Sequence, residues 1–99
     1  MDMNAFRLDG KLALVTGGAN GIGFAIGSAL GSAGAKVVFN STNAEHIEKA
    51  EAAYKEIGID AKGYVCDVTD EEKIKEMVAA IREELGIIDI LVNNAGIIK

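Results

Sequence analysis

The segment Thr16-Gly17-Gly18-Ala19-Asn20-Gly21-Ile22-Gly23 decides the fold of this chain. It follows an almost continuous apolar run over residues 11–16 and opens a stretch of helical periodicity over residues 21–34. A strand, a glycine-rich turn and a helix in this order are typical of a phosphate-binding site. The N-terminus of the helix offers N–H groups without intrahelical partners and a partial positive charge. We therefore predict that this segment binds a phosphate or the pyrophosphate of a dinucleotide.

Each of three glycines has its own role in this prediction. Gly17 allows a tight turn, Gly21 lets the backbone approach the phosphates, and Gly23 allows the helix to pack closely on the strand. Their spacing, glycine-x₃-glycine-x-glycine, differs from the commoner G-x-G-x-x-G pattern. A plain turn is the alternative interpretation, and the strand–turn–helix context favours phosphate binding.

Short apolar runs alternate with helical periods along the rest of the chain. We expect strands over residues 11–16, 36–40, 61–66 and 88–93, and helices over residues 21–34, 44–57 and 70–85. Strands that alternate with helices of this length pair in parallel through right-handed crossovers. The sequence therefore predicts one α/β domain over residues 1–99, a three-layer Rossmann-type sheet with strand order 3-2-1-4.

Local patterns predict how the helices begin and which faces they bury. Asn43 is expected to cap the second helix, and Thr69 is expected to cap the third in a capping box with Glu72. Gly27 and Gly31, inside the first helix, should each cost about 1 kcal/mol relative to alanine, which the sequence alone does not explain. The apolar positions of the first helix that we expect to face the sheet are Ile22, Ile26, Ala29, Leu30 and Ala33.

The composition excludes several classes of function. A net charge of −5 without a basic cluster argues against nucleic acid and against anionic membranes as partners. The uncharged stretch 12–35 is too rich in glycine for a membrane-spanning helix. Cys66 is the only cysteine, so an internal disulfide and a multi-cysteine metal site are excluded. With no apolar leader in the first residues, we expect a cytoplasmic protein that binds no metal.

Three segments resemble the short-chain dehydrogenase/reductase family. They are the glycine segment above, Cys66-Asp67-Val68-Thr69-Asp70 after the third strand, and Asp89-Ile-Leu-Val-Asn93-Asn94-Ala95-Gly96 at the fourth. The resemblance covers the whole chain, and segments 53–70 and 86–98 are most similar to the gluconate 5-dehydrogenases of that family. It implies hydride transfer between a nicotinamide cofactor and a ketone or secondary alcohol of a sugar acid or another small carbonyl compound.

The same resemblance implies roles for individual residues. Asp67 would accept a hydrogen bond from the adenine amino group, and Asn93 would steady the sheet. Asn94 and the two residues after it would line the cofactor. The full set of expected cofactor-binding residues is Gly17, Ala19, Asn20, Gly21, Ile22, Gly23, Ser41, Thr42, Asp67, Val68, Asn94, Ala95 and Gly96.

Cofactor preference depends on the end of the second strand, where members of the family that prefer NAD carry an acid. Here Ser41 and Thr42 stand at that point, and they present no carboxylate that would repel a 2′-phosphate. No lysine or arginine follows to form a charge-assisted contact with the phosphate. Asn20 stands where NADP-dependent members often carry a basic residue. The sequence slightly favours NADP over NAD.

The family's proton donor is a tyrosine with a lysine four residues later, and neither tyrosine of this sequence matches that pattern. Tyr54 has Gly58 at that offset, and Tyr64 has Val68. The catalytic serine, tyrosine and lysine of the family follow the fourth strand. We therefore expect the cofactor half of an incomplete Rossmann-type sheet, no catalytic residue among these positions, and no turnover by this chain alone.

Two alternatives to part of an oxidoreductase remain open. One is a standalone nucleotide-binding or assembly module without catalysis, which would form a homo-oligomer by pairing the apolar fourth strand with a second copy. The other is a structural remnant whose glycine segment is only a turn and binds no cofactor.

Overall fold

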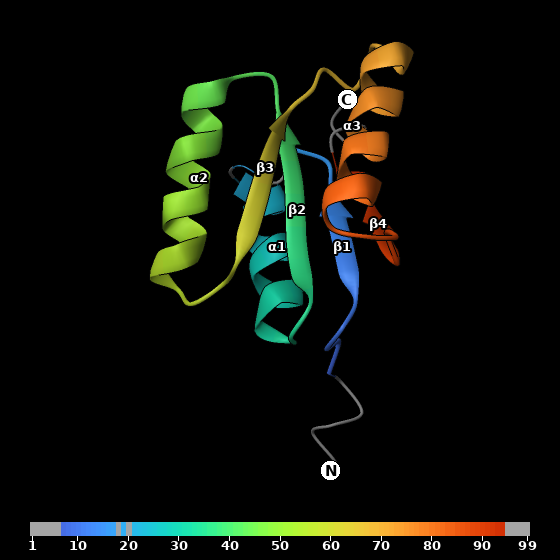
Figure 1. Ribbon diagram of the computed structural model, residues 1–99. Helices are drawn as coiled ribbons and strands as arrows, with labels where there is room; N and C mark the ends of the chain where they lie inside the picture. Colours follow the sequence, from blue (N-terminus) through green and yellow to red (C-terminus); the bar gives the residue numbers. More distant parts are fainter. Residues whose placement is uncertain (1–6, 18, 20, 95–99) are drawn as a thin grey trace.

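The computed structural model describes residues 7–17, 19 and 21–94 (Figure 1). Along the chain lie β1 (Leu12–Val15), α1 (Gly21–Ser32), β2 (Lys36–Ser41), α2 (Ala44–Glu56), β3 (Ala61–Val65), α3 (Glu71–Glu84) and β4 (Ile90–Val92). Every expected strand and helix is present, with bounds close to those that the sequence predicts. The alternation of strands and helices is confirmed.

The four strands form one parallel sheet in the order β3-β2-β1-β4, as predicted. Helices α1 and α2 cover one face of the sheet and α3 covers the other, so the architecture has three layers (Figure 1). The chain moves from β1 through β2 to β3 and then crosses to β4 on the other side of β1. The carboxyl end of β1 is therefore the topological switch point, where ligands bind in such sheets.

Alternation along the strands divides the core into two apolar clusters. On the α3 face, Leu14 and Val38 pack with Met77 and Ile81. The opposite cluster is formed by Val37, Phe39, Ile47, Ala50, Tyr54 and Ile59. Because β1 and β2 are buried on both faces, their sequences are almost continuously apolar, as the helix-covered centre of a parallel sheet requires.

The predicted buried face of α1 is only partly right, because Leu30 packs against the core but the most buried positions of the helix are glycines. Ile22 is 67% exposed, whereas Gly23 and Gly27 are buried. A Cβ on Gly27 would overlap the hydroxyl of Tyr54, and a Cβ on Gly31 would lie 2.5 Å from Cγ2 of Ile59. The helix thus approaches α2 and the loop before β3 through its glycines, which explains their presence inside a helix despite their poor propensity.

One of the two helix caps lies where the sequence predicts it. Asn43 caps α2, accepting hydrogen bonds on Oδ1 from the amides of Glu45 at 2.8 Å and His46 at 3.3 Å. The cap of α3 is Asp70 and not Thr69. Thr69 takes part in the preceding turn, where its amide and its hydroxyl both donate to the Asp67 carboxylate. The next residue, Asp70, therefore caps the helix.

Candidate functional site

Polar groups follow all four strands at the carboxyl edge of the sheet. Each strand of a parallel sheet ends at this edge, so segments far apart in the sequence come together there. The described residues that the sequence predicts for the site and that end a strand or follow one within three residues are Gly17, Ser41, Thr42, Asp67, Val68 and Asn94. Asn20, Ala95 and Gly96 lie outside the described residues.

The turn between β1 and α1 has a backbone that requires glycine. Gly17 has φ +69° and Gly21 has φ +60°, in the region that L side chains rarely adopt. A Cβ on Gly23 would overlap the carbonyl oxygen of Gly17 and lie 2.8 Å from Nδ2 of Asn94. Gly23 therefore lets the first turn of α1 pack closely against the turn that precedes it.

Side chains after β4 hold this turn from the other side. Asn94 is 9% exposed, and its Nδ2 donates to the carbonyl oxygen of Gly17 at 3.4 Å. The hydroxyl of Thr16 lies 3.3 Å from both the carbonyl oxygen of Val92 and Oδ1 of Asn93, and it can donate to either. Both asparagines thus join β4 to the end of β1, so Asn94 supports the glycine turn directly.

Asn40, near the end of β2, contributes to this edge and was not among the expected site residues. Its side chain is buried, its Oδ1 accepts from the amide of Gly17 at 2.8 Å, and its Nδ2 donates to the carbonyl oxygen of Cys66 at 2.9 Å. A polar residue directly after the buried run Val37-Val38-Phe39 is the signal that could have identified it.

The Asp67 carboxylate is hydrogen-bonded within its own loop, because Thr69 donates to it and does not cap α3 as the sequence predicts. Its Oδ1 accepts from the amide of Thr69 at 2.9 Å and from the hydroxyl of Thr69 at 2.7 Å. These hydrogen bonds hold the pKa of the exposed Asp67 carboxyl below its usual range. At neutral pH the group is an anionic acceptor, and no hydrogen bond between described residues engages Oδ2.

A hollow of about 420 Å³ lies between the ends of β2 and β3, next to the Asp67 carboxylate. Thr42 borders it, while Ser41 is half-buried and accepts a hydrogen bond on Oγ from the amide of Asn43 at 3.2 Å. The residues that line the hollow are Thr42, Val65, Cys66, Asp67, Asp70 and Lys73. This arrangement places hydroxyl and carboxylate acceptors beside an open space large enough for a flat heterocycle.

Three further expected residues have other surroundings. Ala19 packs against the cluster on the α2 face. Ile22 is exposed in the first turn of α1. Val68 lines a groove of about 660 Å³ on the α3 face, beside β4. The structure therefore brings the glycine turn and the ends of β2, β3 and β4 together at one edge of the sheet.

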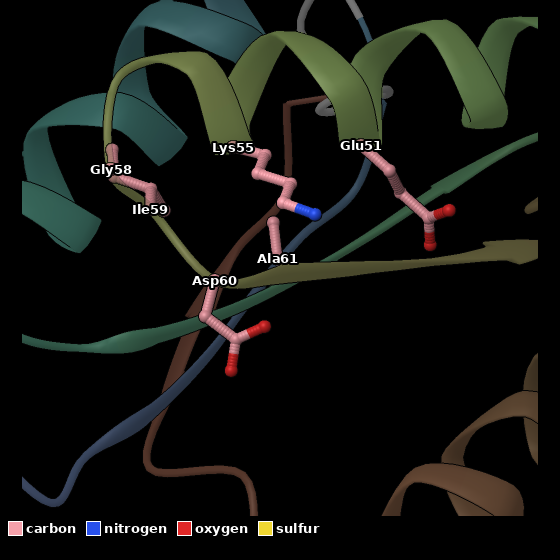
Figure 2. A pocket seen from close by; sticks show the side chains of 6 residues that line it. All are labelled: Glu51, Lys55, Gly58, Ile59, Asp60 and Ala61. Atoms are coloured by element: carbon pink, nitrogen blue, oxygen red, sulfur yellow. The ribbon is translucent and has the colours of Figure 1, made fainter.

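A second hollow, of about 520 Å³, lies at the opposite end of β3, where the strand begins (Figure 2). Glu51 and Lys55 reach over it from α2. The carboxylate of Glu51 accepts from the amide of Gly63 at 2.9 Å, and Asp60 pairs with Lys36 at 2.6 Å. Its acids already bind parts of the fold, and it lies away from the carboxyl ends of the strands, so we do not assign it to the site.

Two other kinds of site are absent from the part of the chain that the structure describes. None of its helices has both the length and the apolar character needed to cross a membrane. Within the same residues, no three His, Cys, Asp or Glu side chains are grouped so that they could hold a metal ion.

Comparison with known proteins defines the class. The sequence profile described as short chain dehydrogenase matches residues 11–99. This chain belongs to the short-chain dehydrogenase family. The glycine turn after β1, the aspartate after β3 and the asparagines after β4 lie on the elements that the resemblance implies.

Among the proteins to which the chain is similar are dehydrogenases of gluconate and of keto-deoxygluconate. The chain is 45% identical to the 2-dehydro-3-deoxy-D-gluconate 5-dehydrogenase of Formosa agariphila, over 100% of this chain and 38% of that protein. It is 46% identical to the gluconate 5-dehydrogenase of Gluconobacter oxydans, over 93% of this chain and 36% of that protein. The crystal structure of 2-keto-3-deoxy-D-gluconate dehydrogenase from Streptococcus agalactiae superposes with a TM-score of 0.90 at 58% identity, over 95% of this chain and 35% of that one.

The chain thus spans little more than a third of the length of these relatives. It corresponds to their N-terminal region, the part in which the family carries its dinucleotide site.

Proposed function

We propose that this chain binds a nicotinamide dinucleotide at the carboxyl edge of its sheet, as the cofactor-binding region of a sugar-acid dehydrogenase. The observation that carries the proposal is the turn from Gly17 to Gly23, which is so tight that a Cβ on Gly23 would overlap the Gly17 carbonyl oxygen. The turn is fixed by Asn40 and Asn94 at the N-terminus of α1. This end of a helix attracts anions, because the N–H groups of its first turn lack intrahelical partners.

The expected residues fit the parts of a dinucleotide in the order of the strands. The pyrophosphate would lie on the N-terminus of α1, reaching the backbone at Gly21. The adenosine ribose would lie near Ser41 and Thr42 after β2, and the adenine would enter the hollow beside Asp67. The amide of Gly17 already donates to Asn40, so the phosphates would be bound by other amides of the turn and helix. When bound, the nicotinamide would supply the hydride acceptor or donor.

We favour NADP over NAD as the cofactor. The side chains at the end of β2 that would meet a 2′-phosphate are hydroxyls, at Ser41 and Thr42, and they can donate hydrogen bonds to it. A carboxylate in that place would repel the phosphate. Asn20, which lies outside the described residues, is the expected neighbour from the glycine turn.

We further propose that these residues supply no proton donor of the family's type. Burial raises the pKa of Tyr54 to about 12, and this side chain packs against Phe24 and Phe39. Tyr64 donates to Glu84 at 2.5 Å on the outer edge of the sheet, far from the glycine turn in the strand order. Proton transfer to a sugar-acid substrate would then depend on residues other than these two tyrosines. We place the protein in the cytoplasm, in keeping with its single buried thiol.

A titration of matched glycine variants tests the proposal. Gly21 and Gly58 both have positive φ, and a Cβ on either meets nothing within 4 Å, but only Gly21 lies at the proposed site. We expect G21V and G58V to lose similar stability, and only G21V to lose NADPH affinity, by about tenfold or more in calorimetry. Equal affinity of the two variants for NADPH, or no binding by the folded wild-type chain, would reject the proposal.

A second candidate function, self-association through β4, is favoured by the apolar surface beside that strand. Ile87 is 70% exposed and Leu91 is 64% exposed, next to the groove on the α3 face. Among the described strands, β4 pairs only with β1. Under this candidate the chain is a homo-oligomer, and sedimentation equilibrium should give a defined dimer that the L91D variant converts to monomer. A monomeric wild-type chain would exclude it.

A further inference from the structure

The buried amide of Asn40 joins two loops that the proposed site needs. Its Oδ1 accepts from the amide of Gly17, in the turn after β1, and its Nδ2 donates to the carbonyl oxygen of Cys66, after β3. The residue is 3% exposed, so water does not compete for either hydrogen bond. One side chain on β2 therefore fixes the positions of the segments that follow both neighbouring strands.

These two segments would bind the pyrophosphate and the adenine, the two outer parts of the ADP portion of the dinucleotide. Gly17 begins the turn proposed for the pyrophosphate, and Cys66 directly precedes Asp67, proposed for the adenine. Ser41, the residue after Asn40, lies between them. The carbonyl oxygen of Ser41 accepts from the amide of Cys66 at 3.0 Å. A dinucleotide that spans these loops needs a fixed separation between them. A displacement of either loop would break the contacts to the pyrophosphate or to the adenine.

We propose that Asn40 is a positioning residue for the cofactor, holding the glycine turn and the Asp67 loop at the separation that a bound dinucleotide requires. This inference rests on the proposed function. Asn40 acts through Gly17 and Cys66 and does not itself contact the ligand. Its role requires an acceptor and a donor on one short side chain, which asparagine supplies and leucine does not.

An aspartate at this position makes the requirement testable by pH. When ionised it can accept from Gly17 but would face the carbonyl oxygen of Cys66 with a second acceptor. When protonated it gains an O–H that can donate to that carbonyl, so both hydrogen bonds return. Burial and the facing carbonyl both disfavour the charged form, which raises the pKa of the introduced carboxyl.

Other charged groups lie near Cys66, at one end of this contact, and the comparison with wild type separates their effects from that of the introduced carboxyl. The charged side chains that act on the Cys66 thiol are those of Asp67, Asp70, Lys73 and Glu76. The wild-type chain carries the same groups. The difference between the pH profiles of N40D and wild type therefore reports the introduced carboxyl.

The experiment measures ADP-ribose affinity of the folded wild-type, N40D and N40L chains between about pH 5 and pH 8. We expect N40D to bind about tenfold more weakly than wild type at the upper end and to recover at the lower end, and N40L to stay weak throughout. The control is N43A, which removes an exposed asparagine that caps α2 and should lose stability without losing affinity. An N40D profile parallel to that of wild type would overturn the inference.

A ligand-free readout separates this inference from the proposed function. Hydrogen exchange and the chemical shift of the Gly17 amide report its bond to Asn40 directly. We expect the amide to exchange faster in N40L and in N40D at high pH, and to regain protection in N40D at low pH. If wild type bound no dinucleotide, the proposed function would fail, whereas an unchanged Gly17 amide in N40L would overturn the role of Asn40 whatever the binding result.

Discussion

Gly27 of α1 lies against the hydroxyl of Tyr54 in α2, so closely that a Cβ on the glycine would overlap the hydroxyl oxygen. The tyrosine ring is held in place by Phe24 and Phe39, whose ring centroids lie 4.4 Å and 5.4 Å from its own. One turn further along α1, Gly31 meets Ile59 in the same way. Together these contacts form a seam that sets the position of α1, and hence of its N-terminus, relative to the rest of the fold.

Adding a methyl group to this seam should destabilise the protein. We expect G27A to lose about 1–3 kcal/mol from overpacking, partly offset by a gain of roughly 1 kcal/mol in helix propensity. Chemical denaturation of G27A, Y54F and the double variant gives the coupling between the two positions. The double variant should recover part of the loss, because it lacks the overlapping oxygen. A G27A chain as stable as wild type would contradict the packing described for this seam.

Cofactor preference should respond to a single charge at the end of β2. In S41D, a carboxylate would face the 2′-phosphate of NADPH and could accept from the ribose hydroxyls of NADH. We expect NADPH affinity to fall by about tenfold or more and NADH affinity to hold or rise, measured by fluorescence titration. The matched control S41A removes the hydroxyl without adding charge and should reduce NADPH affinity far less. Parallel losses for both cofactors in S41D would place the ribose elsewhere.

Acid should weaken the contact between α3 and the edge strand β3. Glu84 accepts from Lys62 at 2.6 Å and from Tyr64 at 2.5 Å, and these hydrogen bonds lower the pKa of its carboxyl. A depressed folded-state pKa stabilises the fold above the ordinary carboxyl range, and this contribution is lost as pH falls through the folded value. The stability difference between wild type and E84Q should therefore shrink in acid.

The neighbouring variant E83Q serves as the control for this contact, because Glu83 forms no ion pair among the described residues. Urea denaturation midpoints from neutral pH down to about pH 3 provide the measurement. A difference between wild type and E84Q that stays constant over that range would show that the Glu84 carboxylate contributes nothing through its charge.

The thiol of Cys66 should be slow to react while the chain is folded. The residue is buried after β3, and burial, with the nearby charges of Asp67 and Asp70, raises the pKa of the thiol. Because the thiolate is the reactive form, a disulfide reagent at mildly alkaline pH should modify the folded chain far more slowly than the chain in denaturant. Equal rates in the two states would indicate that the end of β3 opens readily.

The order of strands and helices could be predicted from the sequence, because each element has its own hydrophobic periodicity and is bounded by turn or capping residues. Gly34, Gly58 and Gly86 all adopt positive φ close to the ends of the three helices, as the sequence patterns suggest. Strand order followed from the glycine turn and the crossover rules. The positions of the glycine turn, of Asp67 and of Asn94 at the carboxyl edge followed from that order.

The details that sequence reasoning missed all depend on contacts between elements. The apolar periodicity of α1 predicted that Ile22 is buried, but the helix makes its closest contacts through its glycines. Hydrophobicity does not indicate where the backbone of one element must approach another element closely. Thr69 satisfies a capping pattern as well as Asp70 does, and only the turn closed by Asp67 decides between them. In the sequence, Asn40 is only a polar residue after an apolar run. Its role depends on its two hydrogen-bond partners, Gly17 and Cys66, which come from other parts of the chain.

The most direct test of a dinucleotide site at the carboxyl edge is an amide-resolved NMR titration of this chain with NADPH. The account predicts that the largest shift changes occur at the amides of Gly21, Thr42 and Asp67, which come from three different loops. Shift changes confined to residues 55–61, around the hollow in Figure 2, would contradict the account, as would the absence of any change in the folded chain.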